Sequence, residues 1–142
     1  MWNKIEKEDD LNNFMNILKD FHDSCIKEFK YTSGAYVDKD LSMYPINDKR
    51  KLRMIIQRQS RNPAVVEIEF SGLYQFNYYP VDENQTCEIL EATMLLKNEC
   101  IYWCDCGGLS ENDFSSYEGT MICAKRIRWR IADEYIGSSD VY

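Results

Sequence analysis

The stretch TMICAKRIRWR, residues 120–130, is the last long apolar segment of the chain and predicts the β-strand that decides the fold. Side chains along a strand point alternately to the two faces of its sheet. On this pattern one face is apolar and holds Met121, Cys123, Ile127 and Trp129. The other face carries mainly a basic ladder of Arg126, Arg128 and Arg130. The strand therefore predicts a sheet with a core on one side and charge on the other.

A second stretch, IYWCDC at residues 101–106, has the same period and is the expected hairpin partner of this strand. Its alternation separates Ile101, Trp103 and Asp105 from Tyr102, Cys104 and Cys106. Trp103 and Trp129 can then meet inside one apolar layer. The segment 107–119 is the expected loop between these two strands.

Residues 8–22, EDDLNNFMNILKDFH, predict an amphipathic helix. One stripe at helical spacing contains Leu11, Phe14, Met15, Leu18 and His22. Asp9 or Asp10 is the expected N-cap, since an acidic side chain there accepts hydrogen bonds from free backbone N–H groups.

Alternating apolar residues predict further strands at about 25–32, 52–59, 64–70, 73–79 and 87–97, with turn residues between them. The polar segment 35–49 is expected to be a loop or a short irregular strand. Helix and strands together predict an α+β fold: an N-terminal amphipathic helix packed on a strongly twisted antiparallel sheet of six or seven strands, a meander or half-barrel.

Chain length, net charge and the distribution of apolar residues limit the class of protein. A chain of 142 residues fits one domain, with an expected core at 9–131 and an exposed tail at 132–142. The net charge of −7 disfavours nucleic acid and anionic lipid as partners and favours a basic protein. No run of about 18 apolar residues and no secretion signal are present, so we expect a cytoplasmic protein that does not span a membrane.

The segment FHDSC, residues 21–25, is the one place where sequence suggests catalysis or small-ligand binding. It brings the single histidine, His22, beside Asp23, Ser24 and Cys25. A Cys-His or Ser-His pair needs the imidazole within hydrogen-bond reach of the nucleophile, and sequence neighbours seldom satisfy this. The favoured interpretation is a histidine packed at the helix end, and an enzyme using these residues is the alternative.

Six cysteines without an export signal indicate free thiols rather than disulfide bonds. Zinc binding by Cys100, Cys104, Cys106 and Cys123 is a second alternative. Structural zinc sites usually take their ligands from C-x-x-C turns, which the C-x-x-x-C-x-C spacing of this segment matches poorly. We therefore expect buried cysteines and no cofactor.

The arginine ladder has two interpretations. Guanidinium groups suit phosphate, so the ladder could bind an anion. Cross-strand pairing with Glu67, Glu69 and Asp105 is the favoured alternative and predicts a solvated ion-pair face.

Tyrosines on the strand at 73–79 are the other candidate surface. Tyr74, Phe76 and Tyr78 share a face, and Gly72 and Pro80 flank them, as is typical of an edge strand. They form either an exposed recognition patch or a covered sheet face.

Four short motifs, FHDSC-I, IEFSGLYQF, IYWCD and IRWR, resemble a group of small bacterial domains known mainly from structural genomics. Some of these are similar to immunity proteins of polymorphic toxin systems, and the resemblance spans residues 11–130. It implies a non-enzymatic cytoplasmic protein that binds and neutralises a toxin, and it transfers no site residues.

The sequence thus predicts a protein-binding domain that docks a basic protein, such as a toxin, through acidic and tyrosine-rich surface. The residues expected to contact the partner are Glu67, Glu69, Tyr74, Tyr78 and Asp105. Charge complementarity of this kind speeds encounter and increases specificity. The oligomeric state stays open at this level.

Overall fold

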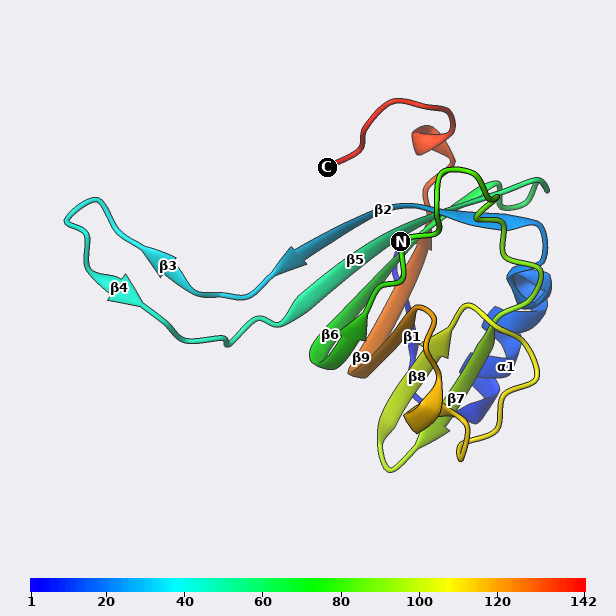
Figure 1. The fold of residues 1–142 in the computed structure, drawn as a ribbon, viewed down its shortest axis with the longest axis horizontal. Helices are drawn as coiled ribbons and strands as arrows, with labels where there is room; N and C mark the ends of the chain where they lie inside the picture. Colours follow the sequence, from blue (N-terminus) through cyan, green and yellow to red (C-terminus); the bar gives the residue numbers. More distant parts are fainter.

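The computed structural model describes all 142 residues and shows an α+β fold with a twisted, open antiparallel sheet (Figure 1). The predicted fold class is confirmed. The sheet has seven strands in the order β2-β5-β6-β9-β8-β7, and β1 also pairs with β9. Its strands are β1 (Asn3–Ile5), β2 (Ser24–Thr32), β5 (Lys51–Arg58), β6 (Val65–Asn77), β7 (Thr93–Lys97), β8 (Cys100–Cys104) and β9 (Met121–Ile131). The helix α1 (Glu8–Ile17) covers one face, which we call the inner face.

Strand β9 organises the sheet, as its sequence predicted. One side of β9 pairs with β6 along residues 121–131. The other side pairs with β8 near Cys123, opposite Tyr102, and with β1 near Arg128, opposite Lys4. The expected hairpin of β8 and β9 is therefore confirmed. Strand β1 was not expected, because three residues are too few to show a period.

The helix is shorter than predicted. It ends at Ile17, and the left-handed backbone of Lys19, Asp20 and Phe21 (φ 51°, 56° and 64°) turns the chain away from the helix axis. His22 consequently lies outside the apolar stripe. The N-cap is Lys7 rather than Asp9 or Asp10, although the Asp10 carboxylate still accepts a hydrogen bond from the Lys7 backbone N–H at 3.1 Å.

The main core lies between the inner face and the helix and contains 21 buried residues. Trp103 and Trp129 belong to this one layer, as predicted, and two phenylalanines from the helical segment link them. Phe14 packs on Trp129 with ring centroids 4.8 Å apart, and Phe21 packs on Trp103 at 5.7 Å. Phe14 and Phe21 are themselves in edge contact at 5.6 Å.

The prediction of the apolar face of β9 is correct for two of its four residues and wrong for the other two. Ile127 and Trp129 face the main core, but Met121 and Cys123 belong to a second cluster with Cys104 and Phe114 on the opposite, outer face. Ile122 and Ala124 take the inward positions instead. The alternation of β9 changes between Ala124 and Ile127, which both face the main core although they are three residues apart. This change lies opposite the part of β6 that contains Gly72 (φ +61°). A local irregularity of this kind moves later side chains to the other face.

Strands β2 and β5 continue past the sheet into a separate two-stranded ribbon of β3 (Tyr36–Val37) and β4 (Met43–Tyr44). In Figure 1 this ribbon projects away from the body of the molecule. The sequence predicted a loop or a short irregular strand here.

The predicted strand at 87–97 is regular only from Thr93, and the residues before it form a single bridge, between Ile89 and Ser24. None of the helices has the length and apolar character that crossing a membrane requires.

Candidate protein-binding surface

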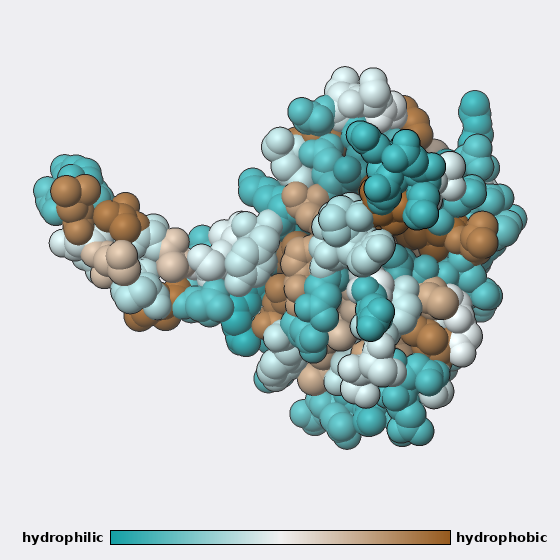
Figure 2. Space-filling view, in the orientation of Figure 1, coloured by the Kyte–Doolittle hydropathy of each residue, from teal (hydrophilic) through white to brown (hydrophobic).

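The projecting segment, residues 33–50, is the part of the chain least covered by the rest, and we call it the arm. Large apolar side chains are exposed along it: Tyr36 by 59%, Val37 by 52%, Leu41 by 83%, Met43 by 69%, Tyr44 by 45% and Ile46 by 64%. Figure 2 shows apolar side chains gathered at the end of the projection. No other segment concentrates exposed apolar residues to this degree.

Local contacts hold the arm. At its tip, the Asp38 carboxylate accepts hydrogen bonds from the backbone N–H groups of Asp40 and Ser42, at 2.9 and 3.0 Å. Tyr36 and Tyr44 stack across the ribbon at 4.8 Å. At its base, Lys49 donates a backbone hydrogen bond to the carbonyl oxygen of Ser33 at 2.9 Å. The arm is thus ordered by turns and pairing, without a core of its own.

Of the predicted contact residues, Tyr74 and Tyr78 are exposed. Tyr74 is 59% exposed and lies at the base of the arm, with the Arg50 guanidinium 5.9 Å from its ring. Tyr78 is 52% exposed and packs edge-on against Phe29 at 5.3 Å. Tyr78 thus packs on a β2 residue that borders the main core.

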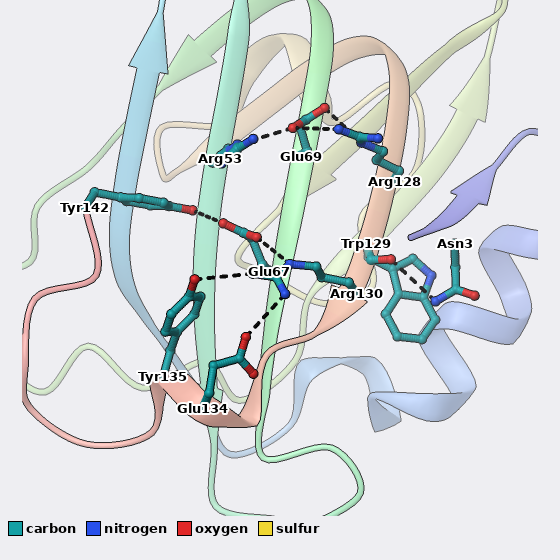
Figure 3. Close-up of polar contacts among 10 residues, drawn as sticks. All are labelled: Asn3, Arg53, Glu67, Glu69, Arg128, Trp129, Arg130, Glu134, Tyr135 and Tyr142. Carbon is teal, nitrogen blue, oxygen red and sulfur yellow. Dashed lines mark hydrogen bonds and ion pairs between the residues drawn. The ribbon is translucent and has the colours of Figure 1, made fainter. Parts of the chain in front are cut away.

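Glu67 and Glu69 occupy a different environment from the one expected. They are only 2% and 4% exposed, so the predicted solvated ion-pair face is wrong. The pairing itself is confirmed: Glu67 lies opposite Arg130 and Glu69 opposite Arg128, with Nε–carboxylate distances of 2.7 and 2.9 Å (Figure 3). In this conformation the two carboxylates face partners within the chain.

Glu69 is the more heavily paired of the two. Its carboxylate also contacts Arg53 at 3.2 Å and Lys51 at 3.9 Å. Burial by itself would raise the pKa of Glu69, but the hydrogen bond from Arg128 and the nearby positive charges outweigh it and lower that pKa below its usual value. The group is therefore held ionised at neutral pH.

The final residues, 132–142, lie across the outer face, and we call them the strap. Most of its residues are exposed, but both ends are anchored to the sheet. The Tyr142 hydroxyl donates to Glu67 at 2.7 Å, and the Val141 backbone N–H donates to Glu28 at 2.7 Å. Near its start, the Tyr135 carbonyl oxygen accepts a hydrogen bond from Gln57 at 2.8 Å. The strap thus helps to bury Glu67.

Asp105, the last predicted contact residue, is half-buried and accepts a hydrogen bond from the Tyr117 hydroxyl. It forms no ion pair with the arginine ladder, contrary to expectation, because the antiparallel register sets Cys104 opposite Met121 and so places Asp105 beside Thr120, at the other end of β9 from the arginines. Burial and the Asp105 carboxylate together raise the pKa of Tyr117. This contact ties the loop at 107–119 to the end of β8.

The residues suggested for catalysis are not arranged for it. The His22 side chain is 60% exposed, with Nδ1 2.7 Å from the Leu90 carbonyl oxygen and Nε2 3.3 Å from Asp23. No hydrogen bond joins its ring to Ser24 or Cys25. Burial raises the pKa of Cys25, which keeps the thiol protonated and a weak nucleophile. A cavity of about 350 Å³ adjoins Asp23, Ser24 and Cys25, but His22 does not line it.

The cysteines suggested for zinc are also not gathered into a site. No three His, Cys, Asp or Glu side chains lie close enough together to hold a metal ion. Cys104 and Cys123 pack in the second apolar cluster, whereas Cys106 is exposed. Burial raises the pKa of Cys104 to about 11, which disfavours the thiolate that zinc requires.

Sequence reasoning missed the arm. A signal was present, because apolar residues at 36, 37, 41, 43, 44 and 46 are unusually frequent for a turn-rich segment.

Comparison with protein-family models, curated proteins and solved structures found no match to this chain.

Proposed function

We propose that this protein is a non-enzymatic protein-binding domain that docks its partner through the arm. The carrying observation is the row of six large apolar side chains, each at least 45% exposed, on a segment whose two short strands pair only with each other. An isolated two-stranded ribbon is marginally stable in water. Exposed apolar surface of this kind usually marks an interaction site.

The composition of the arm suits an interface centre. Tyr36 and Tyr44 offer large, rigid contact areas with little entropy lost on binding, and tyrosine is enriched among the residues that dominate binding energy. Leu41, Met43 and Ile46 can fill pockets on the partner. Acidic and basic residues balance along the arm, since Asp38, Asp40 and Asp48 are matched by Lys39, Lys49 and Arg50.

Charge outside the arm supports a basic partner, such as the toxin that an immunity-like role implies. The chain has a net charge of −7, whereas the arm is neutral. Glu67 and Glu69 are neutralised inside the sheet, so other carboxylates must provide the attraction. The exposed segment 80–91 carries Asp82, Glu83, Glu88 and Glu91 and no lysine or arginine. Such a field raises the rate of encounter with a basic protein.

A capture experiment with matched variants tests this proposal. The bait proteins are the wild type, the arm variant L41S/M43S/I46S and the control L90S, whose altered residue is 66% exposed but lies outside the arm. We expect wild type and L90S to retain the same basic protein from the native host, identified by mass spectrometry, and the arm variant to lose it. Increasing salt should weaken capture by slowing encounter.

Two results would contradict the proposal. The first is capture of the same protein by the arm variant and by wild type in equal yield. The second is the absence of any basic protein that distinguishes wild type from the arm variant at low salt.

A further inference from the structure

The outer face of the sheet is basic although the chain as a whole is acidic. Its cationic side chains come from four strands: Lys4 on β1, Lys27 and Lys30 on β2, Lys51 and Arg53 on β5, and Arg126, Arg128 and Arg130 on β9. The carboxylates among them are Glu6, Glu28, Glu67 and Glu69. This face therefore has more positive than negative charge before the strap is counted.

The strap indicates which chemical groups bind to this basic face. It contributes Asp133, Glu134 and Asp140 and no basic residue. Arg130 contacts the Glu134 carboxylate at 3.2 Å and lies 5.6 Å from the centre of the Tyr135 ring. At this end of the ladder, an acidic and aromatic segment of the same chain thus satisfies the arginine (Figure 3).

The other end of the ladder has no such segment. A cavity of about 250 Å³ opens there, and its lining includes Lys4, Ser71, Arg126 and Arg128. Neither the Lys4 nor the Arg126 side chain forms a salt bridge or hydrogen bond with another residue, although the two lie at one cavity. Unpaired cations that converge on one cavity attract an anion.

Arg128 is already held in place beside this cavity. Its Nε and Nη2 atoms donate to Glu69 at 2.9 and 3.2 Å, and its guanidinium lies 4.4 Å from the centre of the Trp2 ring. Glu69 and Glu6 also line the cavity. Glu69 is shared among Arg128, Arg53 and Lys51, so its charge is more than balanced by these neighbours. The surroundings of the cavity therefore remain positive.

We propose that this cavity binds a phosphate group. The Arg126 guanidinium can hold two phosphate oxygens with parallel N–H donors, the Lys4 ammonium adds a point charge, and the Ser71 hydroxyl adds a third donor. The cavity volume exceeds that of one phosphate and leaves room for an ester substituent. The net charge of −7 disfavours a long polyanion, which leaves a small phosphate ester or a phosphorylated side chain as the source. This site is separate from the arm and does not depend on the proposed function.

Titration with inorganic phosphate at low ionic strength, followed by NMR of ¹⁵N-labelled protein, tests the site. We expect saturable shifts of the Lys4, Ser71 and Arg126 amide signals, with a Kd on the order of 1 mM. R126Q should weaken binding about tenfold, because a hydrogen bond to a charged group is lost, and K4Q/R126Q should abolish it. The control K125Q alters a neighbouring exposed lysine that does not line the cavity and should bind as wild type does.

Unchanged binding by K4Q/R126Q, or non-saturable shifts spread over the whole basic face, would overturn the proposal. Amide spectra of each variant without phosphate show whether it is folded. Glycerol phosphate and a short phosphoserine peptide distinguish the sources, and both outcomes support the site. Equal affinity indicates a small ester, and tighter binding of the peptide indicates a phosphorylated protein. Equal binding of the unphosphorylated peptide would contradict a phosphate site.

Discussion

The outer face of the sheet buries charge, whereas the arm exposes apolar side chains. Glu67 and Glu69 are 2% and 4% exposed, but Leu41 is 83% exposed and Met43 69%. Each region departs from the usual preference of its residue types. The difference lies in where the compensating groups come from. The buried glutamates find theirs within the chain, from arginines and the strap, whereas the exposed apolar groups of the arm find none there.

This contrast separates stability from function. A buried carboxylate is tolerated when its charge and lone pairs are satisfied, and removing the compensating groups is strongly destabilising. An exposed apolar side chain contributes little to the folded state, and it gains free energy only when another surface covers it. The outer-face network should therefore control unfolding, and the arm should control binding.

The largest effect should come from Glu69→Ala. It leaves Arg128, Arg53 and Lys51 without their shared carboxylate. We expect a loss of about 3 kcal/mol in the free energy of unfolding, at the lower end for a broken buried pair because the arginines are partly exposed. Urea denaturation measures it, with exposed Glu83→Gln as the control, expected within about 0.5 kcal/mol of wild type. A change below about 1 kcal/mol for Glu69→Ala would show that the network does not stabilise the fold.

Tyr142→Phe should have a smaller effect. It removes the hydroxyl that donates to Glu67 at 2.7 Å and leaves the ring in place. A hydrogen bond to a charged group contributes about 1.5 kcal/mol, so the free energy of unfolding should fall by that amount. Tyr79→Phe, at a residue that is 58% exposed, is the control. Equal stability of the two variants would mean that the strap does not hold Glu67.

Acid should weaken the same network. The folded-state pKa of Glu69 lies below its usual value of 4.5, so the unfolded chain takes up a proton at this group before the folded one does. The stabilisation is fully present above the usual pKa and is lost as pH falls through the folded-state pKa. Urea denaturation between about pH 6 and pH 3 should show a steeper loss for wild type than for Glu69→Gln. Parallel curves would contradict the lowered pKa.

The smallest effect on stability should come from the arm variant L41S/M43S/I46S. All three side chains are at least 64% exposed, so the free energy of unfolding should stay within about 0.5 kcal/mol of wild type. The same urea experiment measures it, and the capture experiment measures the expected loss of the partner. Destabilisation by more than about 1.5 kcal/mol would show that these side chains support the folded body, and the contrast would fail.

Some of these features could be predicted because their signals are local. The period of two in residues 101–106 and 120–130 identified β8 and the central strand β9, and the stripe of Leu11, Phe14 and Met15 identified the helix face. Opposite charges on neighbouring strands also predicted the pairs of Glu67 and Glu69 with arginines. Each of these inferences needs only the repeat of one element, or the register of two.

The candidate site was harder to predict, because exposure is decided by segments far apart in the chain. Alternation places Glu67 and Glu69 on the outer face but does not say what covers them. Tyr142 reaches Glu67 across 75 residues of sequence, and Trp2 reaches Arg128 from the opposite end. The change of alternation in β9 opposite Gly72, which places Met121 and Cys123 outside the main core, could not be read from the sequence either.

By itself, the sequence determined the α+β class, the helix face and the strand pair of β8 and β9. These depend on backbone periodicity and on the burial of one apolar stripe per element. Tertiary structure alone decided which charged residues are buried and which apolar ones are exposed. Burial depends on the segments that pack over a residue, so the strap encloses Glu67, while the ribbon of β3 and β4 leaves the body and its apolar side chains stay uncovered.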